Sequence, residues 1–365
     1  MAAVAVVKTS MSGVREGLKR ALDSIGYAPS KEAIFIKPNL VRPFPPYRGI
    51  TTHPAVVKAF ISLYPNHRFV IGDGTPVPGD YRRVLRVCGF SSIAGKHSNV
   101  RIVNLDDVPR EPVRCGEKTL RLPVLLRTHE YVNIAKMKTH SQTYVSLAVK
   151  NQKGLLLLAD KKNFHKADLH APIMQLGESV RPALNIVEGL VALEGNGPSF
   201  FGKAKRLGAI IAGKDAFAVD AACCRVMRLD IRAARHLKPD VSFEAVGDGI
   251  KSVRTRFAPP GDRWSIGRMR VYFDEHCCSI CLSNLPVLSR KIIRHPLKLA
   301  KLAYHAAMGD IALVGGNTLP PEAKGKRITF LGECGRRCAQ DAGMARDARI
   351  VGGCPFRPDE LLKLL

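Results

Sequence analysis

Short apolar segments alternate with amphipathic ones along the first hundred residues. Runs of four or five apolar residues are typical of strands buried on both faces, whereas apolar residues three or four positions apart indicate helices. A strand–helix–strand alternation of this kind predicts a mostly parallel sheet. The predicted strands are 3–7, 33–36, 69–71 and 100–103, and the predicted helices are 13–25, 55–63 and 81–87.

The same alternation continues through the middle of the chain. Residues 107–130 predict a hairpin insertion that turns at 115–118. Asp215 is placed to N-cap a helix over 216–227, whose Cys223 and Cys224 we expect in the core. The fold class is therefore α/β, with a mostly parallel Rossmann-like sheet and helices on both faces. The further strands are 131–135, 184–187 and 207–212, and a further helix is 172–180.

Polar side chains follow three of these strands where each one ends. Lys37 and Asn39 follow the second strand, Asp73 follows the third, and Lys136, Lys138 and His140 follow the strand at 131–135. Because parallel strands end at one edge of the sheet, we expect all six to line one electropositive pocket. Two ammonium groups on one side of the chain need a counterion, which predicts an anionic ligand. The alternative is a solvated strand end whose lysines face water.

Several stretches together resemble the domain of unknown function 362 family. The central one is Val132-Asn133-Ile134-Ala135-Lys136-Met137-Lys138-Thr139-His140, followed by Lys150, Asn151 and Gly154. Others are 36–40, 71–74, 188–198 and 212–220. The resemblance covers roughly residues 30 to 250. It implies an α/β fold, a site at these motifs and a frequent association with iron–sulfur clusters, but no particular reaction.

The remaining candidate binding residues each have two interpretations. Lys150, Asn151 and Glu188 are predicted to bind substrate, and Asn39, Asn151 and Asp73 would orient its groups or a divalent cation in the cleft. Asp220 either faces the site or only favours the helix dipole one turn into its helix. The polar run 160–170 is either a lid or a solvated loop; the family resemblance favours His165 as a site residue, and we expect His170 in solvent.

A change of composition near 250–268 predicts a domain boundary. Residues 1–250 would form the family domain, and residues 265–365 a smaller cysteine-rich module. Cys278 and Cys281 have the spacing that lets two thiolates reach one metal, while Cys334 and Cys354 each follow a strand-like run. We expect these four to hold a [4Fe-4S] cluster, with zinc as the alternative and free thiols as a third outcome. The roles of Cys277 and Cys338 stay open.

Charge and composition limit the classes of binding partner that we expect. The chain has 57 Lys and Arg against 31 Asp and Glu, a formal net charge of +26, which raises the local concentration of anions. The basic residues are scattered, and no nucleic-acid-binding motif is present, so nucleic acid is the less favoured partner. No apolar run could span a membrane, the first residues do not resemble a signal peptide, and ten cysteines indicate a reducing compartment. A cytoplasmic location without a membrane is expected.

The resulting functional hypothesis is an iron–sulfur protein that binds or acts on an anionic small molecule carrying carboxylate or phosphate. Lys136, Lys138 and Lys37 would hold the anion, and His140 would transfer a proton or bind a metal. With a cluster close to the cleft, the expected class is an iron–sulfur-dependent oxidoreductase; a cluster distant from the cleft would be structural or would relay electrons from a partner. The alternative is a nucleic-acid-binding or redox-sensing regulator with a zinc or iron–sulfur centre.

Overall fold

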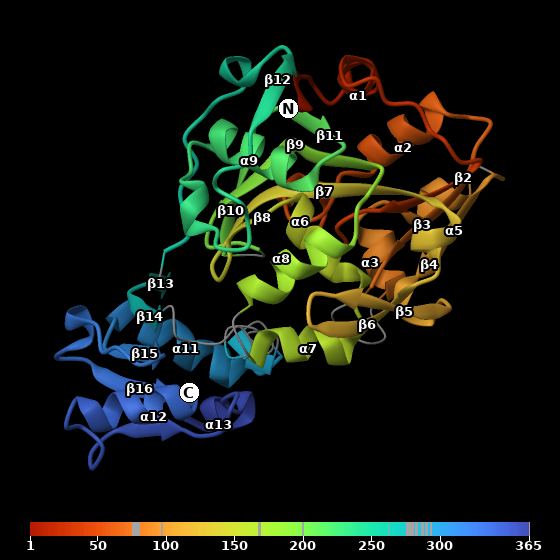
Figure 1. The fold of residues 1–365 in the computed structure, drawn as a ribbon. Coiled ribbons are helices and arrows are strands. Elements are labelled where there is room, and N and C mark those ends of the chain that lie inside the picture. Colours follow the sequence, from red (N-terminus) through yellow and green to blue (C-terminus); the bar gives the residue numbers. More distant parts are fainter. Residues whose placement is uncertain are drawn as a thin grey trace. The chain divides into compact units, whose positions relative to one another are not determined.

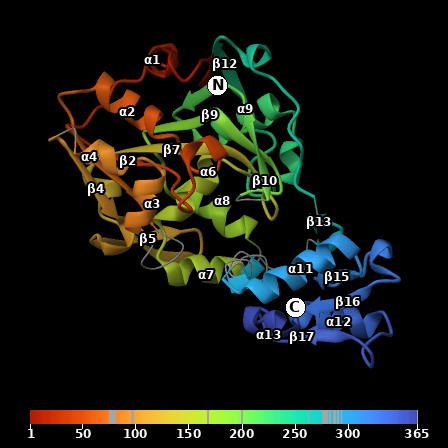
Figure 2. The ribbon, with the colours of Figure 1, turned by 180° about the vertical axis from the view of Figure 1, so that it is seen from behind.

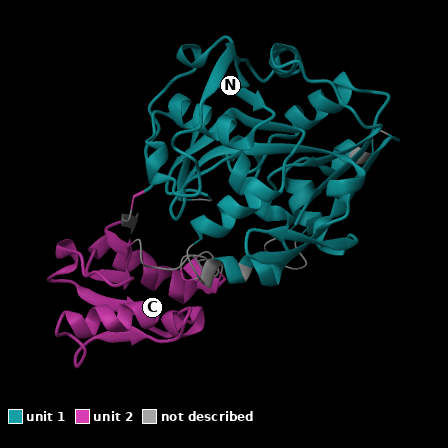
Figure 3. Ribbon diagram, in the orientation of Figure 1, with its two compact units in different colours: residues 1–164, 168–260 teal, residues 165–167, 261–365 magenta. Residues whose placement is uncertain are grey.

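A computed structural model describes most of the chain. It covers residues 1–74, 81–95, 98–166, 169–198, 201–261, 263–274, 281, 284–285, 288, 291–292 and 294–364, with backbone alone at 94, 162, 165, 166 and 263–266. The chain forms two compact units (Figure 3), one of residues 1–164 and 168–260 and the other of residues 165–167 and 261–365. Within the described residues, no helix is both long and apolar enough to cross a membrane.

The large unit is built on a ten-stranded sheet. Its main order is β12-β1-β11-β9-β7-β2-β3-β4, with β8 paired to β7 and β10 paired to β9. All pairs from β9 to β4 along this order are parallel, while β11 runs antiparallel to both of its neighbours. The strands are β1 (Ala2–Lys8), β2 (Ala33–Lys37), β3 (Arg68–Asp73), β4 (Val100–Asn104), β7 (Glu130–His140), β8 (Tyr144–Ser146), β9 (Leu184–Gly195), β10 (Gly202–Arg206), β11 (Ala209–Gly213) and β12 (Phe243–Gly247).

Helices cover both faces of this sheet (Figures 1 and 2). One core lies against α1 (Val14–Ser24), α2 (Pro54–Leu63), α3 (Tyr81–Val87) and α4 (Ser91–Ala94). The other lies against α6 (Ala148–Asn151), α8 (His170–Ser179) and α9 (Ala216–Met227). The predicted α/β class is therefore confirmed. The short helix α5 (Leu125–Thr128) and α7 (Leu158–Lys166) complete the helices described in this part of the chain.

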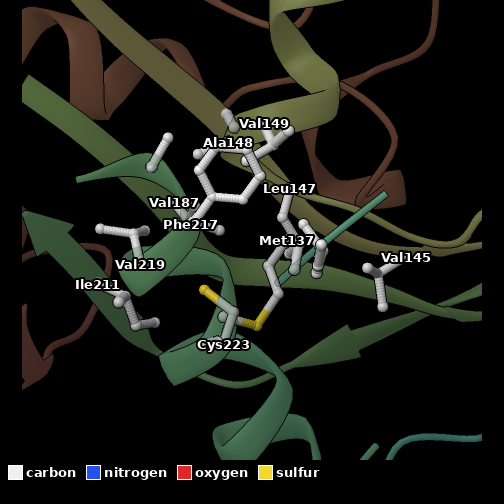
Figure 4. Packing of buried hydrophobic residues seen from close by; sticks show 14 of the residues in the cluster. Met137, Val145, Leu147, Ala148, Val149, Val187, Ile211, Phe217, Val219 and Cys223 are labelled. Carbon is white, nitrogen blue, oxygen red and sulfur yellow. The ribbon is translucent and has the colours of Figure 1, made fainter. Parts of the chain in front are cut away.

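The α9 helix shows how sequence signals translate into packing. Its N-terminus is capped by Asp215, whose Oδ1 accepts hydrogen bonds from the amides of Phe217 and Ala218, as predicted. The buried face of the helix, including Cys223, then packs against Met137 of β7 in an apolar cluster (Figure 4). The expectation that Cys223 and Cys224 are core residues is confirmed, since both are buried.

Two local predictions need correction. The strand predicted over 131–135 continues to His140, because β8 and β9 both pair with its second half. The pairing with β9 has a register shift between Lys136 and Lys138. The polar run after Leu158 is also helical through Lys166, and His170 is buried at the start of α8 instead of facing solvent. The predicted hairpin is present as β5 (Arg110–Cys115) and β6 (Lys118–Pro123).

The small unit has its own sheet of order β13-β14-β15-β16-β17. Its four strands from β14 onward are parallel, and β13 is antiparallel to β14. Apolar residues of β15 and β16 form its core with Cys338. The elements are β13 (Arg263–Ile266), β14 (Met269–Phe273), β15 (Ile311–Gly315), β16 (Arg327–Leu331), β17 (Arg349–Val351), α11 (Pro296–Met308), α12 (Gly332–Asp341) and α13 (Pro358–Leu364).

Candidate functional site

Lys37 and Asp73 form a buried ion pair where β2 and β3 end. Their side-chain atoms Nζ and Oδ1 lie 2.7 Å apart, and the two side chains are 0% and 5% exposed. The second carboxylate oxygen of Asp73 accepts a hydrogen bond from the amide of Leu40 at 2.7 Å. Because β2 and β3 are parallel neighbours, their carboxyl ends meet, which explains why these two residues come together.

Gly154 lies directly on this ion pair. A Cβ atom at this position would overlap both Asp73 Oδ1 and Lys37 Nζ. A glycine is therefore required for the segment after α6 to pass so close to the pair. Gly74 is constrained in a similar way, because a Cβ there would lie 2.7 Å from Lys161 Nζ.

A second buried ion pair joins β7 to β9. Lys136 Nζ contacts Glu188 Oε1, both side chains are fully buried, and Lys136 also donates to the carbonyl of Val191 at 2.9 Å. Glu188 further accepts from the amide of His53 at 2.7 Å. Burial lowers the pKa of Lys136 and raises the pKa of Glu188, and the pairing opposes both shifts. The positive charge of Lys136 is thus balanced within the protein.

Lys138 is buried without a carboxylate partner among the described residues. Its Nζ donates to Asn39 Oδ1 at 2.6 Å and to the carbonyl of Ile50 at 3.0 Å. Burial, and next the charge of Lys136, lower the pKa of Lys138 to about 7. Lys138 can therefore gain or lose a proton near neutral pH.

A chain of four asparagine side chains leads away from Lys138. Asn39 donates to Asn151 Oδ1 at 2.9 Å, Asn151 donates to Asn133 Oδ1 at 2.8 Å, and Asn133 donates to Asn185 Oδ1 at 2.9 Å. Asn185 in turn donates to the carbonyl of Lys214 at 3.2 Å. All four are buried, so this amide chain fixes the position of the acceptor that Lys138 uses.

Three more lysines adjoin Lys138, and we call Lys138, Lys150, Lys153 and Lys161 the lysine cluster. The charges of Lys153 and Lys138 lower the pKa of Lys150, and the charge of Lys161 lowers the pKa of Lys153. Burial is the main cause of a lowered pKa in Lys150, Lys153 and Lys161, and for Lys153 the pKa falls to about 7. In the described part of the chain, Lys150 and the buried Nζ of Lys161 have no hydrogen-bond partner. Lys150 and Lys161 are therefore the two amines of the cluster to which the described residues offer no acceptor.

The other predicted site residues have different placements. His140 is buried at the end of β7, and its Nδ1 accepts from the amide of Gln142 at 3.1 Å. The carboxylate of Asp220 is already occupied, because its oxygens accept hydrogen bonds from the amides of Ala148 and Val149 at 2.7 and 2.9 Å. It holds the start of α6, which carries Lys150. The side chain of His165 lies outside the described residues.

Sequence reasoning missed several members of this network. The apolar pattern assigns Asn133 and Asn185 only to buried strands, although an amide inside such a strand needs buried partners and is itself a signal. Lys153 and Lys161 lie in polar stretches, where the pattern predicts exposed lysines. His236 and His170 were missed as a pair: their Nδ1 atoms lie 3.4 Å apart, and His236 is fully buried.

The cysteines of the small unit gather near the ends of β16 and β17. The buried Cys281 Sγ lies 3.5 Å from the point where a Cβ of Gly332 would be, and Gly332 has a positive φ of 77°. Cys334 is half-buried in the first turn of α12, and Cys354 is exposed beyond β17. Cys277 and Cys278 lie outside the described residues. Among the residues that are described, no group of three or more His, Cys, Asp or Glu side chains is arranged to hold a metal.

Comparison with known families identifies a match over part of the large unit. Residues 34–225, more than half of the chain, match the domain of unknown function DUF362. The chain belongs to the DUF362 family. The matched stretch of DUF362 contains both buried ion pairs, the asparagine chain and the lysine cluster, whereas the cysteines of the small unit lie beyond it.

Two individual proteins are similar to this DUF362 chain. The thylakoid-associated protein sll1697 of Synechocystis sp. is 27% identical over 217 residues, which are 54% of this chain and 64% of that protein. The match thus spans less than two thirds of that relative's length. The lactate racemase apoprotein of Thermoanaerobacterium thermosaccharolyticum aligns with a TM-score of 0.44 and 12% identity, covering 63% of this chain and 58% of that one.

Proposed function

We propose that the large unit binds an anionic small molecule, with a carboxylate or phosphate group held by the lysine cluster. The observation that carries the proposal is the absence of a partner for Lys150 and for Lys161 Nζ within the described residues. Lys37 and Lys136 have carboxylate partners, so they form the frame of the site. An incoming anion would supply the missing acceptors.

Proton linkage supports the same proposal. Burial keeps the cluster amines partly neutral near pH 7, since the pKa values of Lys138 and Lys153 are about 7. A bound anion favours their protonated forms and raises these pKa values. Binding would therefore take up protons from solution, and affinity would fall as the pH rises above about 7.

Inorganic phosphate is the direct probe of this site. Its binding is measured by titration calorimetry and by the shift in melting temperature, with potassium chloride matching the ionic strength. We expect Lys150→Gln to weaken binding by tenfold or more, about 1.4 kcal/mol. Lys203→Gln, which removes the same charge from an exposed position, should leave binding unchanged. Equal losses in both variants would mean that phosphate responds only to the net charge.

His140 and a bound metal extend the proposal. His140 at the end of β7 would transfer a proton to or from the bound molecule.

We further propose that Cys281 and Cys334, with Cys278 and Cys354, bind a [4Fe-4S] cluster or zinc in the small unit. The support is that Cys281 Sγ lies beside Gly332, the first residue of the helix that carries Cys334. Such a centre would supply electrons for a redox reaction if it holds iron, and a cytoplasmic location stays a prediction.

A further inference from the structure

Lys150 and Lys161 are the two lysines of the cluster for which the described residues provide no hydrogen-bond partner, and of these two amines only Lys161 Nζ is fully shut off from solvent. Lys150 is 9% exposed, and no described residue forms a hydrogen bond or ion pair with its Nζ. We propose that Lys150 is a nucleophile that forms an imine with the carbonyl group of an anionic aldehyde or ketone. This inference rests on the proposed function and specifies the class of molecule bound there.

The amines of the neighbouring lysines either have bonding partners or are shut off from solvent. Lys37 and Lys136 pair with carboxylates, and Lys138 donates to Asn39 and Ile50. Lys161 Nζ is shut off from solvent, and it lies near Asp73 and Asp106, whose charges favour its protonated form. Lys150 is therefore the buried lysine best placed to present a lone pair to an incoming molecule.

The charges around Lys150 also favour the neutral amine. Burial lowers its pKa well below the ordinary value, and the two charged neighbours that act on it, Lys153 and Lys138, lower it further. A neutral amine is the reactive form, whereas exposed lysines remain protonated at pH 7 because their pKa is about 10.4.

The backbone on either side of Lys150 is fixed. Asp220 binds the amides of Ala148 and Val149, two residues and one residue before it. Asn151, the next residue, is tied into the amide chain through Asn39 and Asn133. The helical turn that carries Lys150 is thus held in place before any ligand binds, which reduces the entropy lost when the reacting atoms meet.

The reaction is balanced without an oxidant or reductant. The Nζ lone pair attacks the carbonyl carbon and forms a C–N bond, the two protons of the amine pass to the carbonyl oxygen, and the C–O bond breaks as that oxygen leaves as water. The product is an imine; when it is protonated it withdraws electrons from the neighbouring carbon, so a C–H bond there becomes more acidic. Lys138 and Lys153 would hold the anionic group of the same molecule.

A buried histidine pair lies within electrostatic reach of this amine. Burial is the main cause that holds the pKa of His236 well below its ordinary value. Its Nδ1 faces His170 Nδ1 at 3.4 Å, and its Nε2 is buried with no partner in the described part of the chain. A neutral imidazole with one uncommitted nitrogen can carry the proton that leaves with the water.

Reductive trapping tests the proposal on the intact protein. Pyruvate and pyridoxal phosphate are two anionic carbonyl probes, one with carboxylate and one with phosphate, and cyanoborohydride reduces any imine to a stable amine at pH 7. Peptide mass mapping of the labelled protein, without substitutions, should find the adduct at Lys150 before it appears at any exposed lysine. The probe that labels faster identifies the preferred anionic group. Labelling spread over exposed lysines, with Lys150 free, would overturn the proposal.

Variants and competition separate this inference from the proposed function. Lys150→Arg should lose the adduct, whereas Lys58→Arg should keep it, and inorganic phosphate should slow labelling of the natural protein. His236→Gln should slow labelling without weakening phosphate binding. If phosphate binds but Lys150 is never trapped, the imine is wrong and anion binding stands. If phosphate does not bind at all, the proposed function fails first.

Discussion

Lys138 donates a hydrogen bond of 2.6 Å to the side-chain oxygen of Asn39, although the two residues are 99 positions apart in the chain. Both are buried, and Asn39 in turn is fixed by Asn151. The amine is therefore held by neutral groups and not by a carboxylate. Because a neutral acceptor compensates a buried charge less well than an anion does, the proton on Lys138 is weakly held.

This relationship predicts an unusual pH dependence of stability. The pKa of Lys138 is about 7 in the folded chain and about 10.4 in an unfolded one, so between these values the unfolded state binds more protons. The free energy of unfolding should then rise as pH increases from 7 toward 10, by at most about 1.4 kcal/mol per pH unit for this lysine. Denaturant titrations across this range measure it. Lys138→Met should reduce the slope; an unchanged slope would contradict the assignment.

Asn133→Ala should be strongly destabilising. The substitution leaves the carbonyl of Ala148, the oxygen of Asn185 and the amide of Asn151 without their buried partner. Each unsatisfied buried group costs about 1–3 kcal/mol. Asn99→Ala is the control, since Asn99 also donates two hydrogen bonds but is only half-buried. Equal losses in the two variants, measured by urea unfolding, would count against the amide chain as a stabilising element.

Gly154→Ala should disrupt the ion pair of Lys37 and Asp73, which Gly154 contacts. Its new methyl group would meet Lys37 and Asp73, which are held on all sides, so about 1–3 kcal/mol of stability should be lost. A Cβ at Gly95 meets nothing within 4 Å, and Gly95→Ala should change stability by less than about 0.5 kcal/mol. Melting temperatures of the two variants are sufficient for the comparison.

The large unit should fold without the small one. It has its own sheet and two apolar cores, so a fragment of residues 1–260 is expected to be soluble and to unfold cooperatively. It should also keep the stabilisation by phosphate, because the whole lysine cluster lies before residue 165. A fragment that aggregates and lacks a cooperative transition would show that the two units depend on each other.

Cys334→Ser should remove the metal from protein purified without oxygen, while Cys338→Ser should not. Cys338 is buried in the apolar core of the small unit, so its replacement is expected to lower stability but not metal content. Iron, zinc and sulfide analysis with visible absorbance gives the readout. Protein with neither metal would contradict the proposed centre.

The sequence predicted the edge of the sheet where polar groups meet, because each of Lys37, Asp73 and Lys138 follows an apolar run. It did not predict how deeply they are buried. Lys136 and Lys138 read as the exit from a strand, since lysines are rarely enclosed. Glu188 of β9 compensates the buried charge of Lys136, and that partner lies 52 positions further along the chain. Lys138 depends on Asn39, which lies 99 positions before it. Asn133 and Asn185 were hidden for the same reason, because each depends on the other.

The spacing of the buried ion pairs along the chain has a consequence for the order of folding. Lys37 must meet Asp73, Lys136 must meet Glu188, and Asp220 must meet α6. A nascent chain that has formed β7 but not β9 would enclose Lys136 without its counterion, which costs several kcal/mol. Half-assembled sheets are therefore disfavoured, and the strands from β2 to β9 should become protected from hydrogen exchange together, in one late step.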